Sequence, residues 1–301
     1  MAHNNITPDL TATAVPAGFT PPVAIQVRNR RFKRGEPAQR WWAGGDPFAT
    51  AVFNSLSITF PKGEAYFIES VKAHREGAPA ELAAQIRDFV TQEVNHTREH
   101  VAFNKAVTNA GYDIAELERQ VDEELAEARQ RPVIFNLAAT MALEHFTAMF
   151  AHQLLANPRH LRGVEGDAAD LWRWHAVEEI EHKGVAYDTY AHATRDWSRW
   201  KRYKLKSVMM LLVTKNFLSR RYRGAIELLR QDGITGPRAH LGVLRHVLIS
   251  PGILRKAIPD WLSYFKPGFH PWNLDDSHLL AHYDAGAGTA AAHVPGDTAA
   301  A

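Results

Sequence analysis

The sequence predicts an all-α protein, a four-helix bundle with additional C-terminal helices. Apolar residues recur every three or four positions through four long segments, which is the spacing of helices with a buried face. Two segments carry a Glu-x-x-His motif and the other two carry a lone glutamate, in the chain order Glu64, Glu93/His96, Glu144 and Glu179/His182. This alternation is the ligand pattern of a carboxylate-bridged dimetal site in such a bundle.

The composition is that of a globular protein, with 301 residues of which 46% are hydrophobic. A net charge of +2 does not indicate a nucleic-acid partner, and the lack of cysteine excludes disulfides and cysteine-ligated iron–sulfur clusters. Residues 1–22 lack the basic start and apolar core of a signal peptide, and no apolar run approaches the ~20 residues that span a bilayer. We therefore expect a cytoplasmic protein.

The first bundle helix is predicted to begin at Asp46 and Pro47, a suitable N-cap and first-turn pair. Pro61 predicts a kink or break shortly before Glu64. Periodicity places Glu64 in line with the apolar residues Phe53, Leu56, Phe60, Phe67 and Val71. Glu69 falls instead in line with charged residues, so Glu64 is expected to face the core and Glu69 the solvent.

The second helix is predicted from Pro79 to Gly111. Glu93, His96 and His100 interrupt its apolar stripe, and these three side chains span only ~60° of the helix face. They can therefore point at one spot. The highly charged stretch at 113–131 that follows is expected to form a solvated connecting helix.

The third segment, 132–156, is apolar almost all round, and Glu144 is its only acidic residue. A charge in a buried helix is costly unless it is paired or bound to a metal. The alternative is a protonated or arginine-paired core glutamate. The fourth segment repeats the arrangement of the second, because His175, Glu179 and His182 also share ~60° of the helix face between Leu171 and Thr189.

The predicted organisation has four parts: an irregular arm at 1–45, the bundle at 46–196, a helical extension at 197–284 that packs on the bundle, and a disordered tail at 285–301. The extension opens with a basic stretch at 199–223 that flanks the apolar run 208–213. One interpretation is peripheral contact with the anionic inner face of a membrane. The other, which we favour, is a packed helix with solvated lysines and arginines.

Four motifs resemble those of the bacterial "predicted metal-dependent hydrolase" family, grouped with ferritin-like proteins; they read FPKGEAYFIESV, QEVNHTREHVAFN, ALEHF and WHAVEEIEHKGVAYD. The resemblance implies a ferritin-like four-helix bundle over roughly residues 25–280. The histidine four residues before Glu179 is also similar to the third histidine of the p-aminobenzoate N-oxygenase dimetal site. That similarity implies as ligands Glu64, Glu93, His96, Glu144, His175, Glu179 and His182. That similarity does not account for His100, which we expect to support one of the ligands without binding a metal itself.

Carboxylate oxygens with imidazole nitrogens suit two iron ions, with manganese or zinc as alternatives. The leading hypothesis is a non-haem di-iron oxidase or oxygenase that acts on a small, amphiphilic or lipid-like substrate with dioxygen and a separate electron donor. The second is a dinuclear hydrolase that uses a metal-activated water. The third is a non-catalytic metal-binding bundle. The sequence leaves the substrate, the donor and the oligomeric state open, a dimer included.

Overall fold

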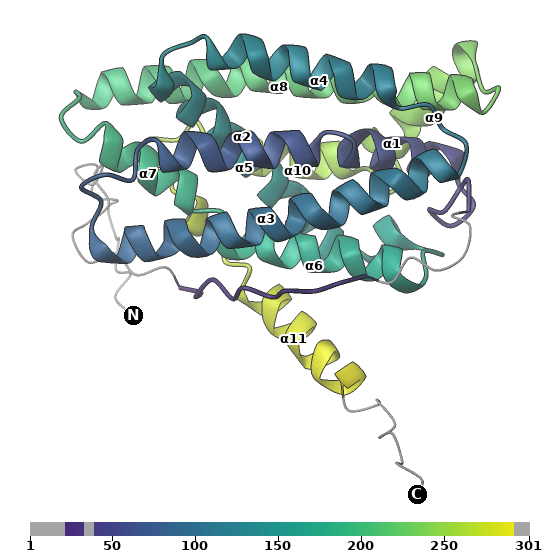
Figure 1. Ribbon diagram of the computed structural model, residues 1–301, viewed down its shortest axis with the longest axis horizontal. Helices are drawn as coiled ribbons and strands as arrows, with labels where there is room; N and C mark the ends of the chain where they lie inside the picture. The colour runs from purple at the N-terminus through teal and green to yellow at the C-terminus, as the bar shows by residue number, and fades with distance from the viewer. Residues whose placement is uncertain (1–21, 33–38, 292–301) are drawn as a thin grey trace, which may run out of the picture.

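The computed structural model describes residues 22–32 and 39–291, and every regular element in these ranges is helical (Figure 1). The predicted all-α fold is confirmed. Helices α2 (Phe60–Lys72), α3 (Ala80–Asn109), α5 (Val133–Ala156) and α6 (Gly166–His182) form a closed ring of contacts, since α2 packs on α3 and α5 and α6 packs on the same two. These four helices carry all the predicted ligands.

A break before Glu64 divides the first bundle segment into α1 (Pro47–Ser57) and α2, as Pro61 predicts. The carboxylate of Asp46 caps α1 by accepting the N–H groups of Phe48 and Ala49. Pro61 lies in the first turn of α2, where a missing N–H loses no helical hydrogen bond. Helix α2 therefore starts afresh just before Glu64 and directs it into the bundle.

The second and third segments also match their predicted bounds, with α3 starting directly after Pro79 and ending before Gly111, whose φ is 91°. Between them, α4 (Ala115–Arg129) buries only Val121 and is the expected solvated connector. Helix α5 crosses the centre of the fold. Among the described helices it alone is long and apolar enough to cross a membrane, but most of its apolar stretch is buried inside the protein.

The fourth segment is not continuous, contrary to the single helix we expected up to Thr189. A short 3-10 turn, η1 (Pro158–Leu161), precedes α6, and α6 ends at His182 before α7 (Val185–Ala193) begins. At the break the C-terminal region packs closely: a Cβ on Gly184 would lie 2.6 Å from Nε1 of Trp272. Lys183 also turns away to bond Asp276 (2.6 Å) and the Leu274 carbonyl. This tertiary packing ends α6 directly after its last predicted ligand.

The C-terminal extension consists of α8 (Arg199–Gln231), α9 (Gly236–Leu248), α10 (Ile253–Ser263), the 3-10 turn η2 (Pro271–Asn273) and α11 (Ser277–Ala291). Helix α8 packs on α1 and α5 and buries Met209 and Leu228, so the packed-helix interpretation describes one of its faces. Its other face leaves Val208, Leu211 and Leu212 exposed. Membrane contact stays a prediction.

Two predictions about the ends of the chain have different outcomes. The expected tail at 285–301 is wrong for 285–291, because α11 continues through Ala291 in a stretch rich in alanine, the best helix former; residues 292–301 lie outside the described part. The arm is irregular where it is described, and it runs along α3 and α6 (Figure 1). There the Arg28 guanidinium pairs with Glu181 at 2.8 Å. Residues 1–21 and 33–38 of the arm also lie outside the described part.

Candidate metal centre

All eight residues singled out in the sequence come together inside the bundle. Each is between 0% and 4% exposed, so none reaches bulk solvent. Helix α2 supplies one residue, α3 three, α5 one and α6 three, namely Glu64; Glu93, His96 and His100; Glu144; and His175, Glu179 and His182. The 3.6-residue helical repeat brings each set onto one face, and the packing of the four helices turns those faces toward each other.

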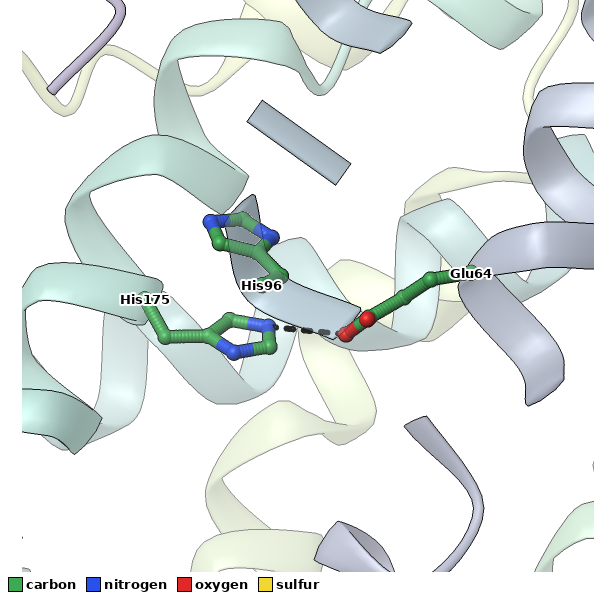
Figure 2. Close-up of side chains that lie close together, drawn as sticks. All are labelled: Glu64, His96 and His175. Atoms are coloured by element: carbon green, nitrogen blue, oxygen red, sulfur yellow. Dashed lines mark ion pairs between the residues drawn. The ribbon is translucent and has the colours of Figure 1, made fainter. Parts of the chain in front are cut away.

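The first group of possible metal ligands is Glu64, His96 and His175, which Figure 2 shows pointing toward one another from three helices. One ligand atom from each lies within 4.8 Å of the others. The Nε2 atom of His175 is 4.0 Å from Oε1 of Glu64. Thr97 donates to the other oxygen of Glu64 at 3.0 Å, which orients this carboxylate and leaves Oε1 facing the histidines.

The second group is Glu93, Glu144 and His182. The Nε2 atom of His182 lies 3.2 Å from Oε1 of Glu93 and 3.4 Å from Oε2 of Glu144. Glu144, the single acid of the apolar segment, therefore lies against His182. Nothing pairs it with an arginine in the described structure, which removes that alternative for Glu144.

Glu93 and Glu179 extend across both groups. Glu179 places Oε1 2.9 Å from Nε2 of His175 and Oε2 3.6 Å from Nε2 of His182. Glu93 places Oε2 3.7 Å from Nδ1 of His96 and Oε1 3.2 Å from Nε2 of His182. Each carboxylate thus presents one oxygen to each half of the site, which is the geometry of a bridging ligand. Glu144, by contrast, reaches only the half of the site that contains His182.

The atoms that face the centre of the cluster are buried and lack hydrogen-bond partners. They are Oε1 of Glu64, both carboxylate oxygens of Glu93 and of Glu144, Oε2 of Glu179, Nδ1 of His96 and Nε2 of His182. Leaving one buried polar group unsatisfied costs about 1–3 kcal/mol, and here eight such atoms share one site. Cations that accept these lone pairs would remove the cost, so the residues fit two metal ions.

The outer nitrogens of His96 and His182 are held by other residues. Nε2 of His96 donates to Glu178 at 3.1 Å, and the indole of Trp174 fixes that carboxylate at 3.0 Å. Nδ1 of His182 donates to Oε1 of Gln92 at 2.9 Å. With the proton of a neutral imidazole on its outer nitrogen, the inner nitrogen would keep a lone pair for a metal. Burial would lower the pKa of His96, but its hydrogen bond to Glu178 and the nearby Glu64 and Glu179 raise it above the ordinary value, so a cation would have to displace a proton there. Outer partners of this kind orient the histidine ligands of metal sites.

His175 is oriented through a chain of three further polar residues. Asn104 donates to the Ser57 carbonyl, so its Oδ1 accepts from the Ser57 hydroxyl at 2.7 Å. Ser57 Oγ then accepts from Nδ1 of His100 at 2.8 Å. This leaves Nε2 of His100 to accept from Nδ1 of His175 at 2.7 Å, and Nε2 of His175 keeps its lone pair toward the cluster. His100 therefore orients His175, a residue that the sequence predicts as a ligand.

The charges of the cluster depend on its burial and on its close neighbours. Burial, together with the neighbouring carboxylates, raises the pKa of Glu64, Glu93 and Glu144 well above the ordinary value. Burial would also raise the pKa of Glu179, but the adjacent His182 and His175 lower it well below its usual range. Burial lowers the pKa of His175 to about 4, so this imidazole is neutral.

Sequence reasoning missed the outer residues Gln92, Glu178, Ser57 and Asn104. Glu178 had one signal, since it precedes Glu179 and lies four residues before His182, within the stretch 174–182 of α6 that has no exposed residue. Ser57 and Asn104 had none, because a serine and an asparagine on apolar segments are ordinary in any helix.

Comparison with known proteins gives one result for this chain. The family model described as "Predicted metal-dependent hydrolase" matches residues 26–275. No curated protein and no solved structure matches the chain. The matched range contains every residue of the cluster and of its outer partners.

Proposed function

The chain belongs to the predicted metal-dependent hydrolase family, and from this membership and its buried cluster we propose that it is a dinuclear metalloenzyme. Glu64, His96 and His175 would hold one ion, Glu144 and His182 would hold the other, and Glu93 and Glu179 would contribute to both. The main support for this proposal is the set of buried carboxylate and imidazole atoms that face the centre of the cluster and lack hydrogen-bond partners. Four carboxylates balance two divalent cations, and three neutral imidazoles add ligands without changing that charge.

Within the proposed site, aromatic rings pack against the histidines and fixed hydrogen bonds orient them. Each proposed histidine ligand packs against an aromatic ring, with the two ring centroids 4.9 Å apart in every case. The pairs are Phe89 with His182, Trp174 with His96 and Phe60 with His175. Fixed outer hydrogen bonds keep the three imidazoles in the tautomer that a cation requires. Such preorganisation leaves little to rearrange during a reaction.

For the reaction we propose oxidation of an organic substrate, with two iron ions supplying dioxygen activation and a separate donor supplying electrons. The hard oxygen-rich ligand set and the aromatic cover support this choice, because a dry pocket protects an oxidising centre. The second candidate is hydrolysis by a metal-activated water, which the description of the family favours. Against it, the cluster is enclosed by apolar side chains that offer few groups to orient a polar substrate.

Metal loading followed by two activity assays tests the proposal. Iron-loaded protein, reduced without air, should consume dioxygen on mixing, while zinc-loaded protein should not hydrolyse a generic ester or phosphodiester. Activity in the anaerobic zinc-loaded sample would reverse the order of the two candidates.

A pair of variants on α2 tests the site itself. Glu64→Ala should lower metal content, whereas Glu69→Ala, on the same helix but paired with Arg129 at the surface, should retain two metals per chain. Equal metal content in both variants would contradict the ligand assignment.

A further inference from the structure

A cavity of about 250 Å³ lies between α2, α4, α5 and α8 and reaches the proposed metal centre. Glu64 lines it, and it is the only one of the eight cluster residues that does so. The remaining wall is mainly apolar and includes Phe67, Leu125, Leu143 and Val213. Leu212 and Phe135 also line it and are 43% and 37% exposed, so the cavity opens to the surface beside α8 and the start of α5. It therefore connects the surface with a proposed ligand.

The part of the wall beside Glu64 is open because of Gly63. A Cβ built on Gly63 would meet no atom within 4 Å, and Gly63 itself lines the cavity. Its φ is not positive, so the backbone does not require glycine there. The cavity volume equals that of roughly eight liquid water molecules, which suits a short acyl chain or a single ring better than a polymer.

Positive charge gathers on the wall contributed by α8. Arg220 is neutralised by Glu124, with Nε 2.9 Å from its carboxylate. Arg221 is half-buried and donates to the backbone carbonyl of Ser55, and in the described part of the chain it forms no ion pair. Burial lowers the pKa of Arg221 to about 10, so the guanidinium is still charged at neutral pH. A guanidinium has five N–H donors, and one carbonyl uses few of them.

We infer that this cavity binds a small anionic amphiphile, whose acidic group pairs with Arg221 and whose apolar body lies against Phe67, Leu125 and Leu143 next to Glu64. The choice follows from charge and polarity together. Glu124, which pairs with Arg220, also attracts Arg221, so two guanidinium groups share one carboxylate in this wall. A neutral apolar molecule would leave the excess positive charge uncompensated, and a polar anion would not fill the rest of the cavity. The inference names the substrate class of the proposed enzyme, and in that respect it rests on the proposed function.

Octanoate and 1-octanol are matched probes, since they differ mainly in the carboxylate. Isothermal titration calorimetry on the metal-loaded and the metal-free protein should show octanoate binding about tenfold or more tightly than octanol, in both forms. Arg221→Gln, which can still donate to the Ser55 carbonyl, should abolish this preference. Arg131→Gln, an exposed arginine on the same cavity, should preserve it. Equal binding of the two probes to the unaltered protein would overturn the inference.

Gly63→Leu tests the position of the apolar body. The new side chain would fill the space beside Glu64 and should weaken both probes by tenfold or more, whereas Gly63→Ala should have a smaller effect. Unchanged binding in Gly63→Leu would place the ligand elsewhere. A preference for octanoate that is present only in the metal-loaded form would assign the carboxylate to the metals instead of Arg221, and would also overturn the inference. The titration of the metal-free protein tests the cavity alone. The metal content of the protein tests the proposed function, so the two proposals can fail separately.

Discussion

Replacing His100 by leucine should weaken metal binding without comparably destabilising the metal-free protein. His100 accepts a hydrogen bond from Nδ1 of His175 at 2.7 Å, and both rings are buried. With a cation on Nε2, His175 must carry its proton on Nδ1, which in the variant has no acceptor. Without a cation, His175 can shift the proton to Nε2 and donate to Glu179, which lies 2.9 Å away. The lost acceptor therefore matters mainly in the metal-bound state.

The magnitude follows from the cost of one buried, unsatisfied N–H group, about 1–3 kcal/mol. This corresponds to a loss of roughly 5- to 150-fold in metal affinity, which agrees with the usual 10- to 100-fold effect of an outer partner of a ligand. By contrast, His175→Ala removes a proposed ligand and should lower metal occupancy or abolish reaction with dioxygen. His100→Leu should still bind two metals at saturation.

Competition with a chromophoric chelator measures the affinity, and thermal unfolding of the metal-free protein measures the stability. Phe103→Leu is a matched control, because Phe103 lies on the same helix and packs against Trp172 and against the ring of His100, but takes no part in the hydrogen-bond chain to His175. It should lower the unfolding temperature and leave metal affinity unchanged. If His100→Leu behaves like Phe103→Leu, the hydrogen-bond chain does not control His175. If His100→Leu loses a metal and His175→Ala does not, the two roles have been assigned the wrong way round.

Three other perturbations have defined outcomes. Glu144→Leu should raise the unfolding temperature of the metal-free protein, because it removes two buried oxygens without partners, and should lower metal content; full metal content would argue against Glu144 as a ligand. His160 is 5% exposed, and burial lowers its pKa to about 4 from 6.5, so its contribution to stability is present above pH ~6.5 and is lost as the pH falls toward 4. The free energy of unfolding, measured with denaturant at pH 7 and pH 4, should fall by up to ~3 kcal/mol less in His160→Leu than in the unaltered protein. An equal fall in both proteins would contradict this role of His160. Membrane contact through the basic residues at 199–223 would make the protein float with anionic vesicles, and less of it at raised salt. Equal recovery on neutral and anionic vesicles, or none, would support the packed-helix interpretation that we favour.

The sequence by itself determined the helical fold and the residues that meet in the site. Both depend on local spacing: apolar positions three and four apart specify buried helix faces, and Glu93 and His96, or Glu179 and His182, share a face whatever the helix packs against. The break before Glu64 was predictable for the same reason, because Pro61 restricts its own backbone.

Only the tertiary structure decided which atoms face one another. That Glu179 spans both halves of the site, while Glu144 reaches only the half that contains His182, depends on how far each helix slides along its neighbours. The chain from Asn104 through Ser57 and His100 to His175 joins residues of α3, α1 and α6, and the helical repeat relates only Asn104 to His100. The end of α6 after His182 and the charged cavity wall on α8 likewise depend on contacts between distant segments, whose energies local spacing does not encode.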